Sequence, residues 1–320
     1  MISPAMLHYG SIAFTVGVSS FSVSIGESLA MISALSAITR QPHMRAEIMR
    51  THMLGAALIE GAAIFSILVV ILLIGWAPLG IVHYSTAICE VGICVAMSLT
   101  CGVLGIVSGF PVVSACFSLA RQPFMSQKII SLMIITQALI QTPLISALMI
   151  VFCIKFQMND LISFYDSFRL FSAGTIIGLG TLGPAIGLSL CAKSAIKTIG
   201  MSRKQYNKIL SFTLISQAII ETPVIFSLIT SLLILFLIKP IQETEHIKII
   251  MLLGATICAG LGTFATGISS GNVAKKAVQE MGMYPDSADQ IVRTSFLAQG
   301  IIETGAIYSI LISFILLFFS

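Results

Sequence analysis

Four related segments of the chain carry a polar residue inside an otherwise apolar stretch. The central residues are Glu60, Gln141, Glu221 and Glu303, spaced 81, 80 and 82 residues apart. A charged carboxyl in the middle of a membrane-spanning helix costs at least about 2.5–3.5 kcal/mol, so such residues are rare and usually functional. A carboxyl that is neutral in apolar surroundings and ionised near a cation or water can carry one ion at a time. The three glutamates are therefore candidate ion carriers.

The residues around the central positions repeat as well. The four segments read Ala56-Ala-Leu-Ile-Glu60-Gly-Ala, Gln137-Ala-Leu-Ile-Gln141-Thr-Pro, Gln217-Ala-Ile-Ile-Glu221-Thr-Pro and Gln299-Gly-Ile-Ile-Glu303-Thr-Gly. One isolated glutamate could simply form a hydrogen bond between helices, but three glutamates at equivalent positions favour ion binding. Thr142, Thr222 and Thr304 follow the central residue and could offer an oxygen to a cation. We expect prolines 143 and 223 to kink their helices.

The composition predicts an all-α membrane protein that positions these residues. The 320 residues are 57% hydrophobic and 9% charged, and the mean hydropathy is +1.02. Soluble domains carry about 25% charged residues, and a membrane span needs about 20 mostly apolar ones. We expect eight transmembrane helices, near residues 8–39, 51–76, 86–119, 129–154, 167–199, 209–238, 247–279 and 291–319.

The repeat predicts four tandem, parallel helical hairpins. Their expected ranges are 1–80, 81–162, 163–242 and 243–320. The first helix of each hairpin carries small residues in three columns, at 17/98/178/260, 24/105/185/267 and 28/109/189/271. Offsets of 7 and 4 residues place these columns on one helix face, so we expect close packing of the odd helices.

The basic residues predict the orientation in the membrane. Of 17 Lys and Arg residues, 13 lie on the side of the short loops within the hairpins. By the positive-inside rule we expect these loops in the cytoplasm of a bacterial-type inner membrane and both termini outside. Two helices per unit give all units the same orientation, which disfavours the inverted repeats of many transporters.

Each central residue lies eighteen residues after Pro42, Pro123, Arg203 or Pro285, within short polar loops. A first helix rich in small residues, an Arg-Gln-Pro loop and a glutamate at this distance resemble the F-type ATP synthase c subunit. The segment Leu297-Ala-Gln-Gly-Ile-Ile-Glu303-Thr-Gly-Ala-Ile-Tyr-Ser-Ile310 is especially similar to the second helix of that family.

The resemblance implies a rotor protein in which Glu60, Glu221 and Glu303 bind the translocated ion. It implies a ring of copies in the lipid membrane, a stator (the a subunit) with an essential arginine, and a central stalk. The stalk would contact Arg40, Gln41 and Pro42, together with Arg121, Gln122 and Pro123. Nucleotide chemistry would occur on other subunits, so we expect no enzymatic activity of the chain alone, no cofactor and no nucleic-acid partner.

Two residues depart from the family pattern. Gln141 cannot carry a proton, whereas Glu27 adds a carboxyl to the first helix, where the other hairpins have Ser108, Leu188 and Ser270. One hypothesis is that Glu27 faces Gln141 and replaces its missing carboxyl. The alternative is that Glu27 is a second ligand beside Glu60, in which case each chain carries three ions per four hairpins.

The ion and the direction of coupling remain open at this point. Sodium-binding members of the family have a Gln or Glu ligand in the column of Glu27, and two of the hairpins that keep the central Glu lack it, which favours protons. The alternatives are a sodium-coupled rotor, a V-type-like ATP-driven pump, or a proton-coupled secondary transporter that uses Glu27 and Glu60 as a relay. A purely structural membrane protein is a further reading.

Overall fold

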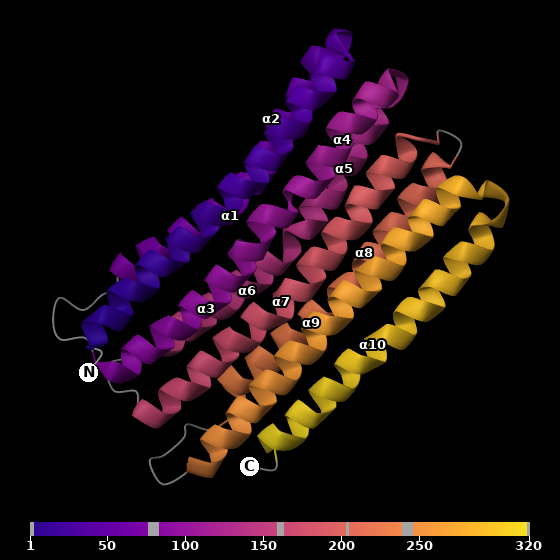
Figure 1. Ribbon diagram of the computed structural model, residues 1–320. Helices are drawn as coiled ribbons and strands as arrows, with labels where there is room; N and C mark the ends of the chain where they lie inside the picture. The colour runs from indigo at the N-terminus through magenta and orange to yellow at the C-terminus, as the bar shows by residue number, and fades with distance from the viewer. Residues whose placement is uncertain (1–2, 76–82, 159–162, 203–204, 239–245, 319–320) are drawn as a thin grey trace.

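The described part of the computed structural model comprises residues 3–75, 83–158, 163–202, 205–238 and 246–318, with no strand among them. Long helices run side by side along one common direction (Figure 1). The helices are α1 (Pro4–Arg40), α2 (Arg45–Gly75), α3 (Tyr84–Val107), α4 (Gly109–Arg121), α5 (Ser126–Ile140), α6 (Thr142–Gln157), α7 (Phe164–Ile199), α8 (Tyr206–Phe236), α9 (His246–Met283) and α10 (Ala288–Phe318). Eight stretches are long and apolar enough to cross a membrane, which confirms the expected all-α membrane fold.

Two of the eight expected spans are interrupted, and both belong to the second hairpin. Its first span divides into α3 and α4 at Ser108, and its second into α5 and α6 at Gln141. Pro111 has no N–H to donate to the carbonyl of Val107, the last residue of α3. The break at Gln141 lies close to the kink predicted at residue 143, whereas the break between α3 and α4 had no predicted counterpart.

Threonine hydroxyls compensate for the prolines near the central residues. The Oγ1 of Thr142 donates to the carbonyl of Leu139, which the missing N–H of Pro143 leaves free. Thr222 does the same for Ile219, four residues before Pro223, and α8 continues through that proline as one helix. These hydroxyls make the Thr-Pro pairs compatible with a membrane-embedded helix.

The helices form two layers. The odd-numbered spans α1, α3/α4, α7 and α9 lie in a row, and α2, α5/α6, α8 and α10 form a second row against them (Figure 1). We call these the inner layer and the outer layer. The gaps between hairpins at 80/81, 162/163 and 242/243 lie in or beside residues outside the described part, so the exact unit boundaries stay predictions.

Glycines let neighbouring inner helices touch through their backbones. A Cβ on Gly26 would overlap the carbonyl oxygen of Gly105, and a Cβ on Gly187 would overlap that of Gly267. Hydroxyls bond across the same seams: Thr100 Oγ1 and Thr181 Oγ1 are 2.7 Å apart. Close backbone approach is how helices associate in lipid, so the expected small-residue packing of the odd helices is confirmed.

Buried charges join neighbouring helices at the end opposite the polar loops. His8 Nδ1 of α1 lies 2.6 Å from Glu90 Oε2 of α3, and both side chains are almost fully buried. In the third hairpin, Arg169 pairs with Asp166 and also donates to the carbonyls of residues 234 and 235 at the C-terminal end of α8. The His8–Glu90 pair joins residues 82 positions apart and has no signal in the sequence pattern.

Candidate ion-binding site

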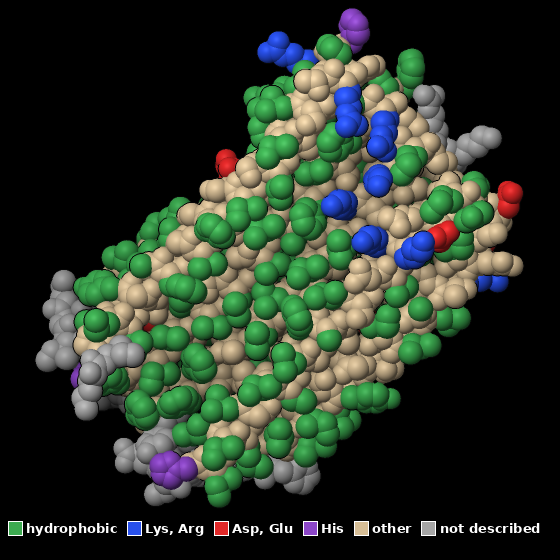
Figure 2. Space-filling model, in the orientation of Figure 1, with side chains coloured by type: hydrophobic (Ala, Val, Ile, Leu, Met, Phe, Trp, Pro, Cys, Tyr) green, Lys and Arg blue, Asp and Glu red, His purple; other side chains and the backbone are tan. Residues whose placement is uncertain are grey.

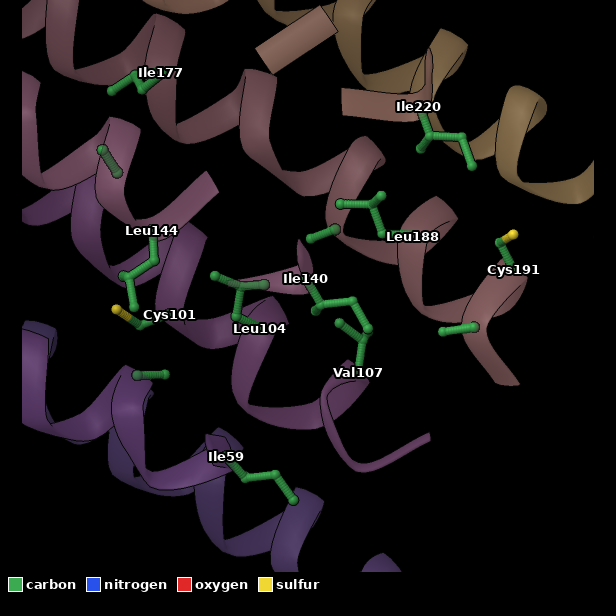
Figure 3. Packing of buried hydrophobic residues seen from close by; sticks show 14 of the residues in the cluster. Ile59, Cys101, Leu104, Val107, Ile140, Leu144, Ile177, Leu188, Cys191 and Ile220 are labelled. Carbon is green, nitrogen blue, oxygen red and sulfur yellow. The ribbon is translucent and has the colours of Figure 1, made fainter. Parts of the chain in front are cut away.

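A buried isoleucine fixes the direction of each central residue in the first three hairpins. Ile59, Ile140 and Ile220 immediately precede the central position and are fully buried. Figure 3 shows Ile140 beside Leu104 and Val107 of the inner layer, and Ile59 and Ile220 lie close to Gly26 and Gly187 of the inner helices. Because successive residues of a helix are turned by about 100°, the next side chain points along the outer layer, toward a seam between hairpins. Glu60 is exposed there, and Gln141, Glu221 and Glu303 are partly buried.

The seam between the third and fourth hairpins contains the best-defined carboxyl site. Thr222 Oγ1 of α8 donates to Glu303 Oε1 of α10 over 2.5 Å. The same hydroxyl lies 2.9 Å from the carbonyl of Ile219. Two hairpins thus contribute to one carboxyl site, and two of the predicted residues are brought into contact.

Gln141 occupies the corresponding position at the seam between the first and second hairpins. Its Nε2 donates to the carbonyl of Leu58 in α2 over 3.0 Å and to Ser108 Oγ over 3.1 Å. The break between α3 and α4 at Ser108 and the break between α5 and α6 at Gln141 are therefore joined by the hydrogen bond between these two side chains. An amide fits this position as a donor, because one of its two partners is a carbonyl that can only accept.

Glu27 lies against Glu60 and not against Gln141. The carboxyls of Glu27 and Glu60 are within hydrogen-bonding reach of one another. Glu27 Oε1 and Gln141 Oε1 are both buried without a hydrogen-bond partner, so these two side chains are not joined. This arrangement favours the alternative in which Glu27 is a second ligand beside Glu60, and compensation by Glu27 for the missing carboxyl of Gln141 stays a prediction.

Three glutamines one helical turn before the central residues form a set that received no role from sequence. Gln137, Gln217 and Gln299 are fully buried. Their partners are the inner-helix residues 29 positions earlier: Gln137 Nε2 donates to the carbonyl of Ser108 and Gln217 Nε2 to that of Leu188. The Oγ of Ser270 donates to Gln299 Oε1. Their recurrence in three repeats is the signal that could have identified them.

This set explains the position of Glu27. The first hairpin has Ala56 where the others have glutamine, and the residue 29 positions before it is Glu27. The long polar side chain has moved from the outer helix to the inner helix of the same hairpin. Glu27 is thus the counterpart of the buried glutamines, and it places a second carboxyl beside Glu60.

The remaining predicted residues are at the expected places along the helices. Glu221 lies within α8, and Thr304 Oγ1 donates to the carbonyl of Ile301 in its own helix. Arg40 and Arg121 end α1 and α4, Gln41 and Gln122 cap them, and Pro42 and Pro123 begin short 3-10 turns. Residue 203 of the third loop lies outside the described residues.

Three segments of the chain match the family model of the ATP synthase C subunit: residues 11–73, 171–234 and 253–316. The chain belongs to the ATP synthase C subunit family. The matched segments contain the three central glutamates.

Single relatives match about the length of one hairpin of this C subunit family member. The ATP synthase c subunit of Latilactobacillus sakei is 39% identical over 66 residues, which are 21% of this chain and 94% of the relative. The ATP synthase c subunit of Thermotoga maritima is 38% identical over 65 residues, 20% of this chain and 76% of the relative. The Alkaliphilus oremlandii protein is 42% identical over 65 residues, 20% of this chain and 70% of the relative. The chain therefore repeats a c-subunit hairpin in tandem, as a rotor proteolipid and integral membrane protein.

Proposed function

We propose that this chain is a fused c subunit that translocates protons through the membrane sector of an F-type ATP synthase. Glu60, Glu221 and Glu303 are the carriers, and the inner layer lines the inside of a ring of several chains. The observation that carries the proposal is the carboxyl of Glu303, held by Thr222 of the neighbouring hairpin in the middle of an apolar helix. A carboxyl inside a membrane-spanning helix costs free energy, so its presence at this position supports a role in ion transfer.

The contacts at Glu303 suit proton transfer. The hydroxyl of Thr222 has one hydrogen and two nearby acceptors, Glu303 and the carbonyl of Ile219. When Glu303 is ionised, the hydroxyl can donate to it. When Glu303 is protonated, the carboxyl can donate to the Thr222 oxygen while the hydroxyl donates to Ile219. The site thus accommodates both protonation states without moving the backbone.

The exposed edge of α1 supports assembly with further copies. The small-residue columns are buried in the second, third and fourth hairpins, whereas Gly17, Ser24 and Ser28 of the first are exposed. A Cβ on Gly17 would meet nothing within 4 Å. The neighbour that fits this face is α9 of a second chain, so that the last hairpin of one copy packs on the first hairpin of the next. Repetition of this head-to-tail contact closes a ring.

The same arrangement supplies the missing half of the first site. Glu60 is exposed in a single chain, and Thr304 lies at the corresponding position of the fourth hairpin. In a ring, Thr304 of a second copy would face Glu60 as Thr222 faces Glu303. The Arg-Gln-Pro loops would meet the central stalk on the cytoplasmic side, and the outer layer would pass the a subunit of the stator.

The test is mass-spectrometric mapping of dicyclohexylcarbodiimide labelling on the purified full chain, with and without sodium. The reagent modifies protonated carboxyls in apolar surroundings. We expect labelling at Glu60, Glu221 and Glu303. Glu47 and Glu280 at the loop end are the matched controls within the same molecule, and they should stay unmodified. Absence of labelling at all three central glutamates would refute the carrier role.

A sodium-coupled rotor is the second candidate, and the Glu27–Glu60 contact favours it. Two carboxyls within reach of each other offer several oxygens to one hard cation, whereas two neighbouring negative charges repel without it. Sodium that slows labelling at Glu60 and Glu27, at constant pH, would establish this alternative. Labelling that is independent of sodium would support protons.

A further inference from the structure

A stripe of half-buried apolar side chains runs along the inner-layer face of α7 and ends in two lysines. Phe171, Leu182 and Leu190 mark this stripe, and Lys193 and Lys197 follow it on the same helix face. From Phe171 to Leu190 the helix rises about 28 Å, at 1.5 Å per residue. That length is close to the ~30 Å hydrocarbon core of a bilayer. The lysines thus lie where the apolar part of a membrane against this face would end.

A third lysine from the neighbouring helix joins them. Lys275 of α9 is the counterpart of Lys193, and its backbone carbonyl accepts a hydrogen bond of 3.0 Å from Ser194 Oγ, the residue next to Lys193. Lys193 Nζ also lies 4.7 Å from the centre of the Phe110 ring in α4. Figure 2 shows Lys and Arg side chains gathered over the loop-end half of this face, with mostly hydrophobic and uncharged side chains below them. Like charges gathered on one face repel one another, and an anion among them offsets this repulsion.

No acidic side chain supplies that anion in the described part of the chain. The carboxylate nearest along α9 is Glu280, and it is paired with Lys276. None of the ion pairs between described residues involves Lys193, Lys197 or Lys275. The three ammonium groups therefore have spare donors for an external acceptor.

The space next to the lysines has room for a polar headgroup. A groove of about 230 Å³ lies between α7 and α9 on the loop side of Lys193. It is lined by Lys197, Thr198, Met201, Gln279, Gly282 and Met283. Its wall is mostly apolar, and the polar side chains that a headgroup beyond the phosphate would meet there are Lys197, Thr198 and Gln279.

The packing of the helices does not require these lysines. At the positions equivalent to Lys193 and Lys275, the first two hairpins have Ile32 and Val113. Their first basic residues on the inner helices are Arg40 and Arg121, about 12 Å closer to the loops. Cations thus reach deeper into the inner face only at the third and fourth hairpins.

We propose that Lys193, Lys197 and Lys275 bind the phosphate of an anionic phospholipid on the inner-layer face. The acyl chains of the lipid would cover the apolar stripe of α7, with the phosphate among the lysines and the headgroup in the groove. A lipid fits better than free phosphate or an acidic protein because the cationic cluster continues directly into a stripe of bilayer length. Basic residues near the surface of an anionic membrane contribute about fivefold in affinity each.

The test uses the full-length protein in nanodiscs with equal amounts of phosphatidylglycerol and phosphatidylcholine. The protein is released from the nanodiscs, and native mass spectrometry counts the lipid molecules that stay bound to it. We expect the wild type to retain phosphatidylglycerol preferentially. The double variant Lys193→Gln/Lys275→Gln should lower this preference about 25-fold, from about fivefold per lysine. Lys193→Arg/Lys275→Arg keeps the charges and should retain the preference.

The matched control removes two lysines from the outer layer, Lys128→Gln/Lys208→Gln. Lys128 lies over the ring of Tyr206 and Lys208 is paired with Asp289, so neither is available in the same way. We expect the control to change the preference less than about twofold. Equal losses in both double variants would overturn the proposal, since they would indicate a general charge effect. Displacement of the lipid by inorganic phosphate, or retention of an acidic protein in its place, would overturn it as well.

Discussion

The hydroxyl of Thr222 lies 2.5 Å from the carboxyl of Glu303, and this contact joins the third and fourth hairpins at the level of the central glutamates. The carboxyl is thus held by a hairpin other than its own. When Glu303 is protonated, the same hydroxyl can donate its one hydrogen to the carbonyl of Ile219, which Pro223 leaves without a donor. One side chain therefore serves the site in one protonation state and the helix in the other.

Replacement of Thr222 by valine should impair the Glu303 site. A hydrogen bond to a charged group contributes about 1.5–3 kcal/mol, so we expect ion pumping driven by ATP to slow at least about tenfold. Thr222→Ser keeps the hydroxyl and should retain activity. Thr213→Val is the control, because Thr213 is buried in the same helix but bonds only the carbonyl of Ile209. Similar rates for Thr222→Val and Thr213→Val would contradict the role of the hydroxyl.

Leucine in place of Gly17 should separate folding from assembly. Nothing lies within 4 Å of a Cβ at this position, so the isolated chain should keep its thermal stability. In a ring, the larger side chain would meet the next copy and prevent closure, which native gel electrophoresis detects as loss of the large species. Gly300→Leu on α10 is the matched control, because its Cβ also meets nothing and its position is exposed in every hairpin. A ring that assembles normally with Gly17→Leu would argue against the proposed contact.

Glutamate in place of Gln141 should create a fourth carrier. The new carboxyl would accept the bond from Ser108 when ionised and could donate to the Leu58 carbonyl when protonated. We expect carbodiimide labelling at position 141 and an ion-to-ATP ratio that rises by about a third, because the carriers per chain rise from three to four. Each charge works against about 2.3 kcal/mol per 100 mV, so the largest potential reached by ATP hydrolysis should fall by about a quarter. An unchanged ratio with position 141 labelled would mean that Glu27 already supplies the fourth ion.

Glutamine in place of Glu90 should destabilise the chain without touching the carriers. Glutamine offers His8 Nδ1 a weaker partner than the carboxyl does, and a poorly satisfied buried polar group costs about 1–3 kcal/mol. The double replacement His8→Phe/Glu90→Met removes both polar groups and should recover most of that stability. Thermal unfolding in detergent measures both effects. If Glu90→Gln unfolds at the wild-type temperature, His8 and Glu90 contribute little to the contact of α1 with α3.

The sequence predicted the fold well because each relevant feature repeats within one helix. Apolar length defines the spans, and offsets of 7 and 4 residues place Gly105 and Gly109 on the face that packs on Gly26. Both kinds of pattern depend only on helix geometry.

The site was harder to predict because its contacts join different helices. The position of Glu27 along the helix axis would allow contact with either Glu60 or Gln141. Which of the two it contacts depends on the rotation of α1 about its own axis, which the sequence pattern does not specify. The roles of Gln137, Gln217 and Gln299 depend on inner-helix partners 29 residues away in sequence. The partner of Glu90 likewise depends on how deeply His8 lies in the seam between α1 and α3.

The fusion of four unequal hairpins has a consequence for the stepping of the motor. A ring closed from whole chains contains a number of hairpins divisible by four, and every fourth step presents Gln141, which carries no charge. At that step the electric field exerts no torque through the passing hairpin. The rotation would then depend on elastic energy stored during the three loaded steps, so that a single-molecule trace should show one longer dwell for every chain in the ring.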